Sequence, residues 1–256
     1  MRAGTALLLL LTACHEEPSA KAQPATVSAC NDEMFEGSRF TVCDPDADRI
    51  ELVAAAPNEQ PVRQLAELET SLGQRSQQVS FAMNAGMYDQ DGRPIGLAIV
   101  EGRQVHAINL RKGGGNFHLM PNGVFQILRN GSAEIVSSDR WKASPRIRIA
   151  TQSGPMLVID GKLHPAFEPD GSSRYVRNGV GIAPDGRPRF VISTGEVSLG
   201  KFARYFRDGL KCRSALFLDG AVSALWDPDN HRRDLTKPLG PMIVAFRPTA
   251  ESAPRP

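Results

Sequence analysis

The stretch IRIATQSGPMLVIDG at residues 147–161 contains the pattern that decides the fold. Two short runs rich in Ile, Leu, Val and Ala, residues 147–151 and 156–159, are separated by the break Gln152-Ser153-Gly154-Pro155 and followed by Asp160-Gly161. Short apolar runs bounded by Gly, Pro and Asp-Gly pairs are typical of β-strands joined by tight turns. This stretch therefore predicts two strands and a hairpin turn.

The same pattern recurs along most of the chain. Asp-Gly pairs begin at residues 91, 160, 170, 185, 208 and 219, and most of them lie beside short apolar runs. Because these signals are typical of hairpins and turns, the molecule is predicted to be rich in strands. Further strands are expected at residues 39–42, 50–54, 79–83, 96–100, 123–128, 180–183, 190–193, 215–218 and 242–246.

Two segments have helical periodicity instead. Residues 61–72 carry leucines at helical spacing, with a proline at the start and a glycine just beyond the end. Residues 198–210 carry apolar side chains at i, i+3, i+4, i+7 and i+11, and Ser198 can cap this helix. Hairpins and a few helices without regular strand-helix alternation predict an α+β fold with mixed, mostly antiparallel sheets and a few packed helices, in a single domain.

The N-terminus, MRAGTALLLLLTAC, has the features of a bacterial lipoprotein signal. Arg2 supplies a positive start, residues 6–11 form an apolar run, and small residues precede Cys14. This run is far shorter than the roughly 20 residues that span a bilayer. We expect residues 1–13 to be removed and Cys14 to carry lipid. The alternative, a buried N-terminal strand or helix, does not explain why a cysteine stands at the cleavage point.

The rest of the chain divides into three parts. Residues 14–29 combine the lipid anchor with a stretch rich in Glu, Pro, Ser and Ala, the composition of a flexible tether. Residues 30–247 are long enough for one sizeable domain, and residues 248–256 are expected to be a disordered tail. His15 follows Cys14 where Asp would commonly retain a lipoprotein at the inner membrane. We therefore expect a cell-envelope lipoprotein, at the periplasmic face of the outer membrane if the host is Gram-negative.

Charge and cysteine usage narrow the function classes. The 30 basic and 28 acidic residues give a net charge of +2 and are spread through the sequence, so no nucleic-acid footprint is present. Cys30 and Cys43 flank a short polar segment in a compartment where disulfides persist, and we expect them to be bridged. Cys212 lies in an apolar context typical of a buried hydrophobe rather than a catalytic thiol.

Polar residues able to do chemistry gather where apolar runs end, at positions that a strand would deliver to one edge of a sheet. Small neighbours such as Ala85 and Gly86 let the backbone approach a ligand, and an arginine presents a planar fork to a phosphate. Without further evidence, an ordinary turn, a flexible loop or a surface arginine explains each position as well. The candidates are Asn84, Asn116, Asn122, Gln152, Ser153, Arg177, Asn178, Asp219 and Ser223.

Two common site types are not supported by the motifs. The glycines at 113–115 could wrap a phosphate, but no Lys-Ser or Lys-Thr pair and no helix follows, which excludes a P-loop. Metal-ligand spacings such as Cys-x-x-Cys are absent. We expect no organic cofactor, and a divalent metal stays open because Asp and Asn at strand ends also suit hard cations.

Four motifs in order resemble the phosphodiester glycosidase family, the relatives of the lysosomal uncovering enzyme that removes N-acetylglucosamine from a mannose 6-phosphate diester. They are Asn84-Ala-Gly, Gln152-Ser-Gly-Pro-Met-Leu-Val-Ile-Asp-Gly, Arg177-Asn-Gly-Val-Gly and Leu218-Asp-Gly-Ala-Val-Ser. The likeness runs from about residue 40 to residue 246. It looks closest to a bacterial branch known as a domain of unknown function, in which Gly-Asn-Phe, Pro-Asn-Gly and Gln-Ser-Gly-Pro are typical.

The resemblance implies hydrolysis of a sugar-1-phosphodiester at the anomeric carbon, in extracytoplasmic glycan or glycopolymer, which leaves a phosphomonoester. It implies that Asp219 acts as general base or nucleophile against an oxocarbenium-like transition state. Because the phosphodiester is a weakly basic leaving group, a strong general acid is less necessary. Among the other matched residues, we expect Arg177 with Asn84 and Asn178 to hold the phosphate, and the substrate to contact Asn116, Asn122, Gln152, Ser153 and Ser223.

Some points stay open in the sequence. A second carboxylate could be Asp89, Asp160 or Glu196. Many relatives carry Leu-Asp-Gly-Gly-x-Ser where this chain has Ala221, and if that position needs a positive φ, alanine costs about 1 kcal/mol. The main alternative function is a non-catalytic glycan-binding envelope lipoprotein. A serine hydrolase is a weaker alternative because neither Ser153 nor Ser223 lies in a Gly-x-Ser-x-Gly elbow.

Overall fold

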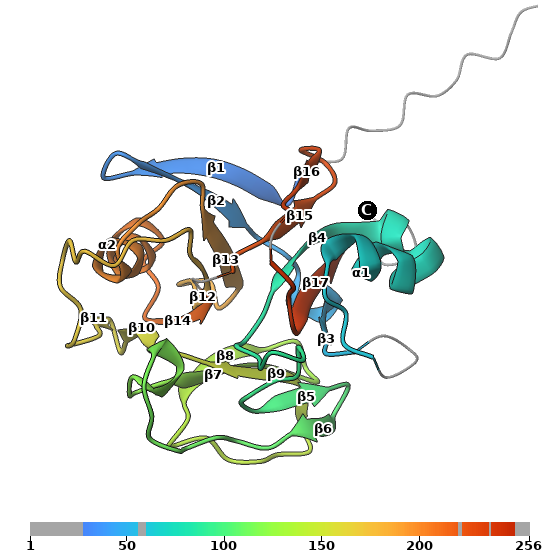
Figure 1. Cartoon of the computed structure of the whole chain (residues 1–256), viewed down its shortest axis with the longest axis horizontal. Coiled ribbons are helices and arrows are strands. Elements are labelled where there is room, and N and C mark those ends of the chain that lie inside the picture. The colour runs from blue at the N-terminus through green and yellow to red at the C-terminus, as the bar shows by residue number, and fades with distance from the viewer. Residues whose placement is uncertain (1–27, 56–59, 220–221, 236, 249–256) are drawn as a thin grey trace, which may run out of the picture.

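The computed structural model describes residues 28–55, 60–219, 222–235 and 237–248. The described chain folds into three antiparallel sheets and two α-helices, α1 (Leu65–Leu72) and α2 (Leu199–Arg204), as Figure 1 shows. This confirms the predicted α+β fold class. The expected signal, the lipidated Cys14, the tether before residue 28 and Ala221 lie outside the described residues, as does the tail beyond residue 248.

The sheets contain the following strands. The seven-stranded sheet has the order β1-β2-β13-β12-β14-β10-β11, with β1 Cys30–Phe35, β2 Ser38–Cys43, β13 Pro188–Ser193, β12 Asn178–Ile182, β14 Ser214–Asp219, β10 Met156–Ile159 and β11 Lys162–Leu163. The second sheet has the order β16-β15-β4-β17-β3, with β16 Arg232–Arg233, β15 Leu225–Asp227, β4 Val79–Asn84, β17 Met242–Phe246 and β3 Ile50–Val53. The third has the order β6-β5-β9-β7-β8, with β6 Arg103–His106, β5 Ala98–Val100, β9 Ile147–Ser153, β7 Gly123–Leu128 and β8 Ala133–Ser137.

One face of each sheet packs into a shared central core. Phe190 of the seven-stranded sheet contacts Phe81 of the second sheet and Phe125 of the third, with ring centroids 5.6 and 5.5 Å apart. All three side chains are fully buried. Since apolar burial is the dominant stabilising term in folding, this core fixes the three sheets relative to one another.

The outer faces of two sheets are covered by the helices (Figure 1). Helix α2 packs Phe202 and the adjoining Phe206 against the seven-stranded sheet. Gly179 and Gly181 of β12 make this approach feasible, because a Cβ at Gly181 would lie 2.6 Å from the Phe206 ring. Helix α1 covers the second sheet through Leu65 and Leu68.

Every predicted strand region contains a strand, and residues 123–128, 156–159 and 242–246 have the predicted bounds. The sequence missed β1, β6, β8, β11, β15 and β16. Strand β1 was missed because it is a polar edge strand that pairs only with β2 and is largely exposed. Helix α1 begins at Leu65 rather than at residue 61. In the segment just before the helix, the Arg63 N–H donates to Glu67 Oε2 at 2.7 Å. Beyond α2 the chain continues as a π-helical segment at Tyr205–Gly209. At the start of α2, the Ser198 side chain accepts from the Lys201 N–H, which confirms the predicted cap.

The cysteines also agree with the predictions. Cys30 and Cys43 are cross-strand partners of β1 and β2 and form a disulfide. Cys212 is free and buried, and burial raises the pKa of its thiol to about 12, which keeps it protonated. No helix in the described ranges has the length and apolar character needed to cross a membrane.

Removing the disulfide is expected to destabilise the fold. It closes a short loop, with a sequence separation of 13, and the loss of such a constraint costs about 3 kcal/mol. The double variant Cys30→Ser and Cys43→Ser should therefore unfold at lower urea than the oxidised chain. Cys212→Ala, which removes a thiol and leaves the disulfide in place, is the control. An unchanged urea midpoint of the double variant would contradict this expectation.

Candidate active site

Asp219 stands where a fully buried strand ends. Leu216, Phe217 and Leu218 of β14 are completely buried, whereas Asp219 retains 8% of its exposure. Its backbone N–H donates to Asn178 Oδ1 at 2.9 Å, and its Oδ1 accepts from the Val222 N–H at 3.4 Å. A buried strand therefore positions this carboxylate, and the Val222 N–H lies within hydrogen-bonding distance of it.

Two buried asparagines hold that loop. Asn84, at the end of β4, donates from Nδ2 to the Val222 carbonyl at 2.8 Å and accepts at Oδ1 from the Ala224 N–H at 2.9 Å. Asn178, at the start of β12, donates from Nδ2 to the carbonyl and Oδ1 of Asn84 at 2.8 and 3.1 Å. Both side chains are 0% exposed and committed to the chain. In the structure they hold the backbone around Asp219, and their predicted contact with phosphate stays a prediction.

The two candidate serines donate to backbone. Ser153 is buried and donates to the Leu218 carbonyl at 2.7 Å. The Ser223 hydroxyl lies 3.0 Å from the carbonyl oxygens of both Val176 and Asp219. A serine nucleophile would instead donate to a neighbouring base, so this geometry does not favour a serine hydrolase.

The remaining amide candidates separate into buried and exposed residues. Gln152 accepts at Oε1 from the N–H groups of Leu97 and Asn109, both at 2.9 Å, and Asn122 donates to the Phe117 carbonyl at 2.8 Å and accepts from the Ser138 hydroxyl. Both are 1% exposed and hydrogen-bonded to neighbouring segments, and their predicted contact with substrate stays a prediction. Asn116 is exposed, and its predicted contact with substrate stays a prediction.

Arg177, which is expected to hold the phosphate, is fully buried. Its Nε donates to the Val197 carbonyl and its Nη2 to the Ser173 carbonyl, both at 2.8 Å. Its Nη1 is buried without a hydrogen-bond partner in the part of the chain that the structure describes. Burial lowers the pKa of this guanidinium to about 10, and the Tyr175 and Phe217 rings lie 5.4 Å away. Arg177 therefore braces the segments around the site.

The structure separates the three candidates for a second carboxylate. Asp160 sits in the β10–β11 turn, and since Val158 pairs with Ala215, this turn lies beyond the opposite end of β14 from Asp219. Asp89 closes its own turn by accepting from the N–H groups of Asp91 and Arg93. Glu196 is exposed and lines a cavity together with Ser223.

Tyr88 is a residue near Asp219 that the sequence did not single out. Its hydroxyl donates to the Pro238 carbonyl at 2.9 Å, which ties the segment after β4 to the segment before β17. Burial and then the charge of Asp219 raise the pKa of this phenol to about 12. The hydroxyl therefore stays protonated at neutral pH beside the carboxylate.

A cavity of about 470 Å³ is lined by Val222 and Ser223, which follow Asp219 closely in the sequence. Ser223 and Val222 form one wall, and Glu196 and the half-exposed Tyr175 another. Positive charge comes from Lys237 and from Arg232, whose guanidinium is ion-paired with Asp234 at 2.9 Å. The cavity thus offers a carboxylate, an aromatic ring, a hydroxyl and cations. Among the described residues, no group of three or more His, Cys, Asp or Glu side chains is placed to hold a metal ion.

The family comparison agrees with this arrangement. Residues 77–246 match the family model described as phosphodiester glycosidase, and the chain belongs to this family. The matched region contains all nine candidate site residues.

Particular relatives cover most of the chain. The uncharacterized protein YigE of Escherichia coli K12 is 35% identical over 198 residues, which are 77% of each chain. The catalytic domain of zebrafish N-acetylglucosamine-1-phosphodiester alpha-N-acetylglucosaminidase, auto-inhibited by its pro-peptide, has a TM-score of 0.60 at 15% identity, over 90% of this chain and 86% of that one. A hypothetical protein from Synechocystis has a TM-score of 0.52 at 15% identity, over 85% and 61%. The two solved structures show the same fold.

Asn84→Asp tests the positioning role. It replaces the Nδ2 donor by an oxygen facing the Val222 carbonyl, and we expect a loss of about 3 kcal/mol in the free energy of unfolding at pH 7. Burial should raise the pKa of the introduced carboxyl above its unfolded value of about 3.9. The folded state then binds more protons than the unfolded state in this window, so stability should recover as pH falls from 7 toward 4.

The measurement is urea unfolding at several pH values. Asn130→Asp is the matched control, because Asn130 lies in an exposed turn. Equal stability of the two variants at pH 7 would show that Asn84 does not hold the loop.

Proposed function

We propose that the chain hydrolyses a sugar-1-phosphodiester at the anomeric carbon in extracytoplasmic glycan. The observation that carries this is the placement of Asp219, a nearly buried carboxylate at the end of β14 whose backbone N–H donates to Asn178, close in sequence to Val222 and Ser223, which line a polar cavity. Membership of the phosphodiester glycosidase family and the printed activity of the zebrafish relative support this reaction class.

Asp219 is assigned the attack on the anomeric side. It acts as nucleophile or as general base toward water, and its negative charge stabilises an oxocarbenium-like transition state. The surrounding buried strand and the Asn84 and Asn178 amides keep the carboxylate in place, so little reorganisation is needed during reaction.

Glu196 and Tyr175 are assigned to the sugar. Glu196 is the only one of the three candidate second carboxylates that lines the cavity, where it can accept hydrogen bonds from sugar hydroxyls or activate water. The exposed face of Tyr175 offers an apolar platform for a sugar ring, and Arg177 lies behind it.

The phosphate is assigned to Lys237 instead of Arg177. Arg177 is buried, whereas Lys237 is exposed and lines the cavity. A lysine binds phosphate as a point charge.

A location at the cell envelope fits this reaction. The expected lipid on Cys14 would anchor the domain outside the cytoplasm, where phosphodiester-linked glycans are present and nucleotide sugars are not. This favours hydrolysis over a biosynthetic transfer.

Asp219→Asn is expected to lower kcat/KM for a sugar-1-phosphodiester about a thousandfold, because the amide cannot attack or accept a proton. Release of reducing sugar is the measurement. Asp160→Asn, at the opposite end of β14, is the matched control and should keep full activity.

Equal turnover by Asp219→Asn and the wild-type chain would overturn the assignment of Asp219. Absence of turnover by the wild-type chain, with calorimetric binding of the same ligands, would favour a non-catalytic glycan-binding lipoprotein. Activity with and without a chelator decides the metal requirement.

Lys237→Gln is expected to raise KM about tenfold with a smaller change in kcat, because it removes a charge-assisted contact with the substrate phosphate. The difference from the wild-type chain should shrink as salt is added, since an exposed charge is screened. Steady-state kinetics at several salt concentrations test this, and an unchanged KM at low salt would refute the role.

A further inference from the structure

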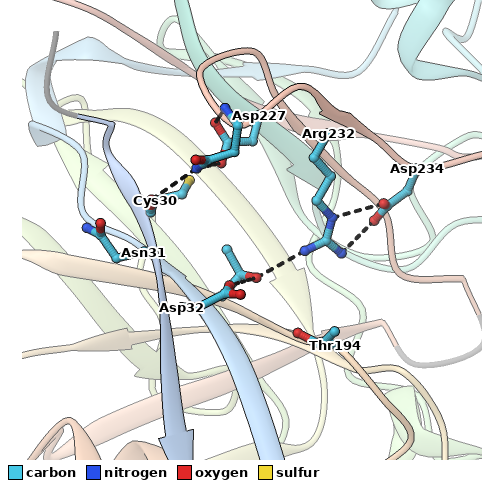
Figure 2. Close-up of a pocket in the computed structure, with 9 residues that line it drawn as sticks. Cys30, Asn31, Asp32, Thr194, Asp227, Arg232 and Asp234 are labelled. Atoms are coloured by element: carbon cyan, nitrogen blue, oxygen red, sulfur yellow. Dashed lines mark hydrogen bonds and ion pairs between the residues drawn. The ribbon is translucent and has the colours of Figure 1, made fainter. Parts of the chain in front are cut away.

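A second cavity, of about 630 Å³, lies next to the candidate active site. It lies between the β1–β2 hairpin and the β15–β16 hairpin, where two of the sheets meet (Figures 1 and 2). The side chains that line it are mostly polar, and they include Asp32, Thr41, Asp227, Asn230, Arg232 and Asp234.

One chain of contacts crosses this cavity, as Figure 2 shows. Arg232 pairs with the Asp234 carboxylate through Nε and Nη2, both at 2.9 Å, and donates from Nη1 to the Thr41 hydroxyl at 3.0 Å. Thr41 in turn donates to Asp32 Oδ1 at 2.7 Å. These contacts join the two hairpins and hold the cavity walls at a fixed spacing.

A second set of contacts closes the other end. Asn230 donates from Nδ2 to Asp227 Oδ2 at 2.7 Å and lies 3.3 Å from the Cys30 carbonyl. Asp227 is 1% exposed, and Cys30 is fixed by the disulfide. The walls are therefore preformed, which lowers the entropic cost of binding a ligand.

The two cavities are neighbours. Thr194, Arg232 and Asp234 line both of them. The second cavity, with Asp32 in its wall, therefore lies beside the cavity that Ser223 lines. A ligand bound in one cavity can extend toward the other.

The chemistry of the second cavity selects the class of ligand. Three carboxylates, Asp32, Asp227 and Asp234, line the cavity with one guanidinium, that of Arg232, which is committed to Asp234 and Thr41. Asp227 is nearly buried, and Asp32 also lies 3.7 Å from the guanidinium of Arg39. The remaining capacity is mainly that of hydrogen-bond acceptors, which suit hydroxyl donors. Negative charges of a polyphosphate chain would be repelled here, and no metal-binding group is present among the described residues.

We propose that this cavity binds a neutral sugar chain. Its position relative to the scissile bond rests on the proposed function, and the substrate is then a phosphodiester that carries an uncharged oligosaccharide. A polymer with a phosphate in every repeat does not fit, because its charges would lie against Asp32, Asp227 and Asp234.

Binding of neutral oligosaccharides tests this without any hydrolysis. The probes are tetrasaccharides of glucose, mannose, galactose and N-acetylglucosamine, with poly(glycerol phosphate) as the anionic comparison. Saturation-transfer NMR with the full chain in detergent detects binding, and titration gives Kd. Because the probes contain no phosphodiester, the result is independent of whether Asp219 is catalytic.

Two variants address the cavity. Asp32→Lys reverses a charge at an exposed position, and Thr194→Trp fills space from another exposed position that lines the cavity, so both should fold, as thermal melting checks. Glu168→Lys, an exposed acid that lines neither cavity, is the matched control for the charge change.

We expect at least one neutral tetrasaccharide to bind the wild-type chain and Glu168→Lys equally, and both cavity variants to weaken its Kd at least fivefold. Poly(glycerol phosphate) should not compete. The proposal is overturned if no tetrasaccharide binds, if either cavity variant binds like the wild-type chain, or if poly(glycerol phosphate) displaces the sugar.

Discussion

The contact between Asn84 and Asn178 is the interaction on which the site depends. It joins the end of β4 in one sheet to the start of β12 in another, and the two amides together fix the backbone on both sides of the loop after β14. A satisfied buried amide bond adds only about 1 kcal/mol, but an unsatisfied partner costs about 1–3 kcal/mol. The Asn84 and Asn178 side chains are completely buried. A different position of Asp219 would leave their polar groups unpaired and is therefore unfavourable.

The central core makes that contact geometrically feasible. Phe81 lies on β4, three residues before Asn84, and Phe190 lies on β13, which pairs with β12. Their ring contact sets the spacing of the two sheets, so the asparagines meet at hydrogen-bonding distance. On the outer side, Gly179 and Gly181 let α2 pack directly on β12. Apolar packing thus determines where the strands end, and the two asparagine amides hold the backbone at the end of β14.

The sequence predicted the positions of the strands better than it predicted the contacts of the polar residues at their ends. Apolar runs such as residues 123–128 are strands because burial dictates their pattern, and polar residues at their ends do converge on one region. Burial of a polar residue, however, depends on partners from distant segments. Gln152 is satisfied by Asn109, and Arg177 by Val197 and Ser173, which no local pattern reveals. The second cavity was missed for a related reason, since β1 and β16 are polar edge strands and β15 is only three residues long.

The buried and the exposed polar residues of the site therefore make different kinds of contact. The motif residues that identify the family, including Asn84, Gln152, Arg177 and Asn178, are buried and act on the chain itself. The groups open to a ligand come from outside those motifs: Glu196 follows β13, Lys237 lies between β16 and β17, and Asp32 belongs to the edge hairpin. Changes at these peripheral positions disturb few buried contacts, so they can alter which substrate is bound while the position of Asp219 is preserved. The buried motif contacts therefore determine the position of Asp219, and the exposed residues of the cavity walls can change without displacing it.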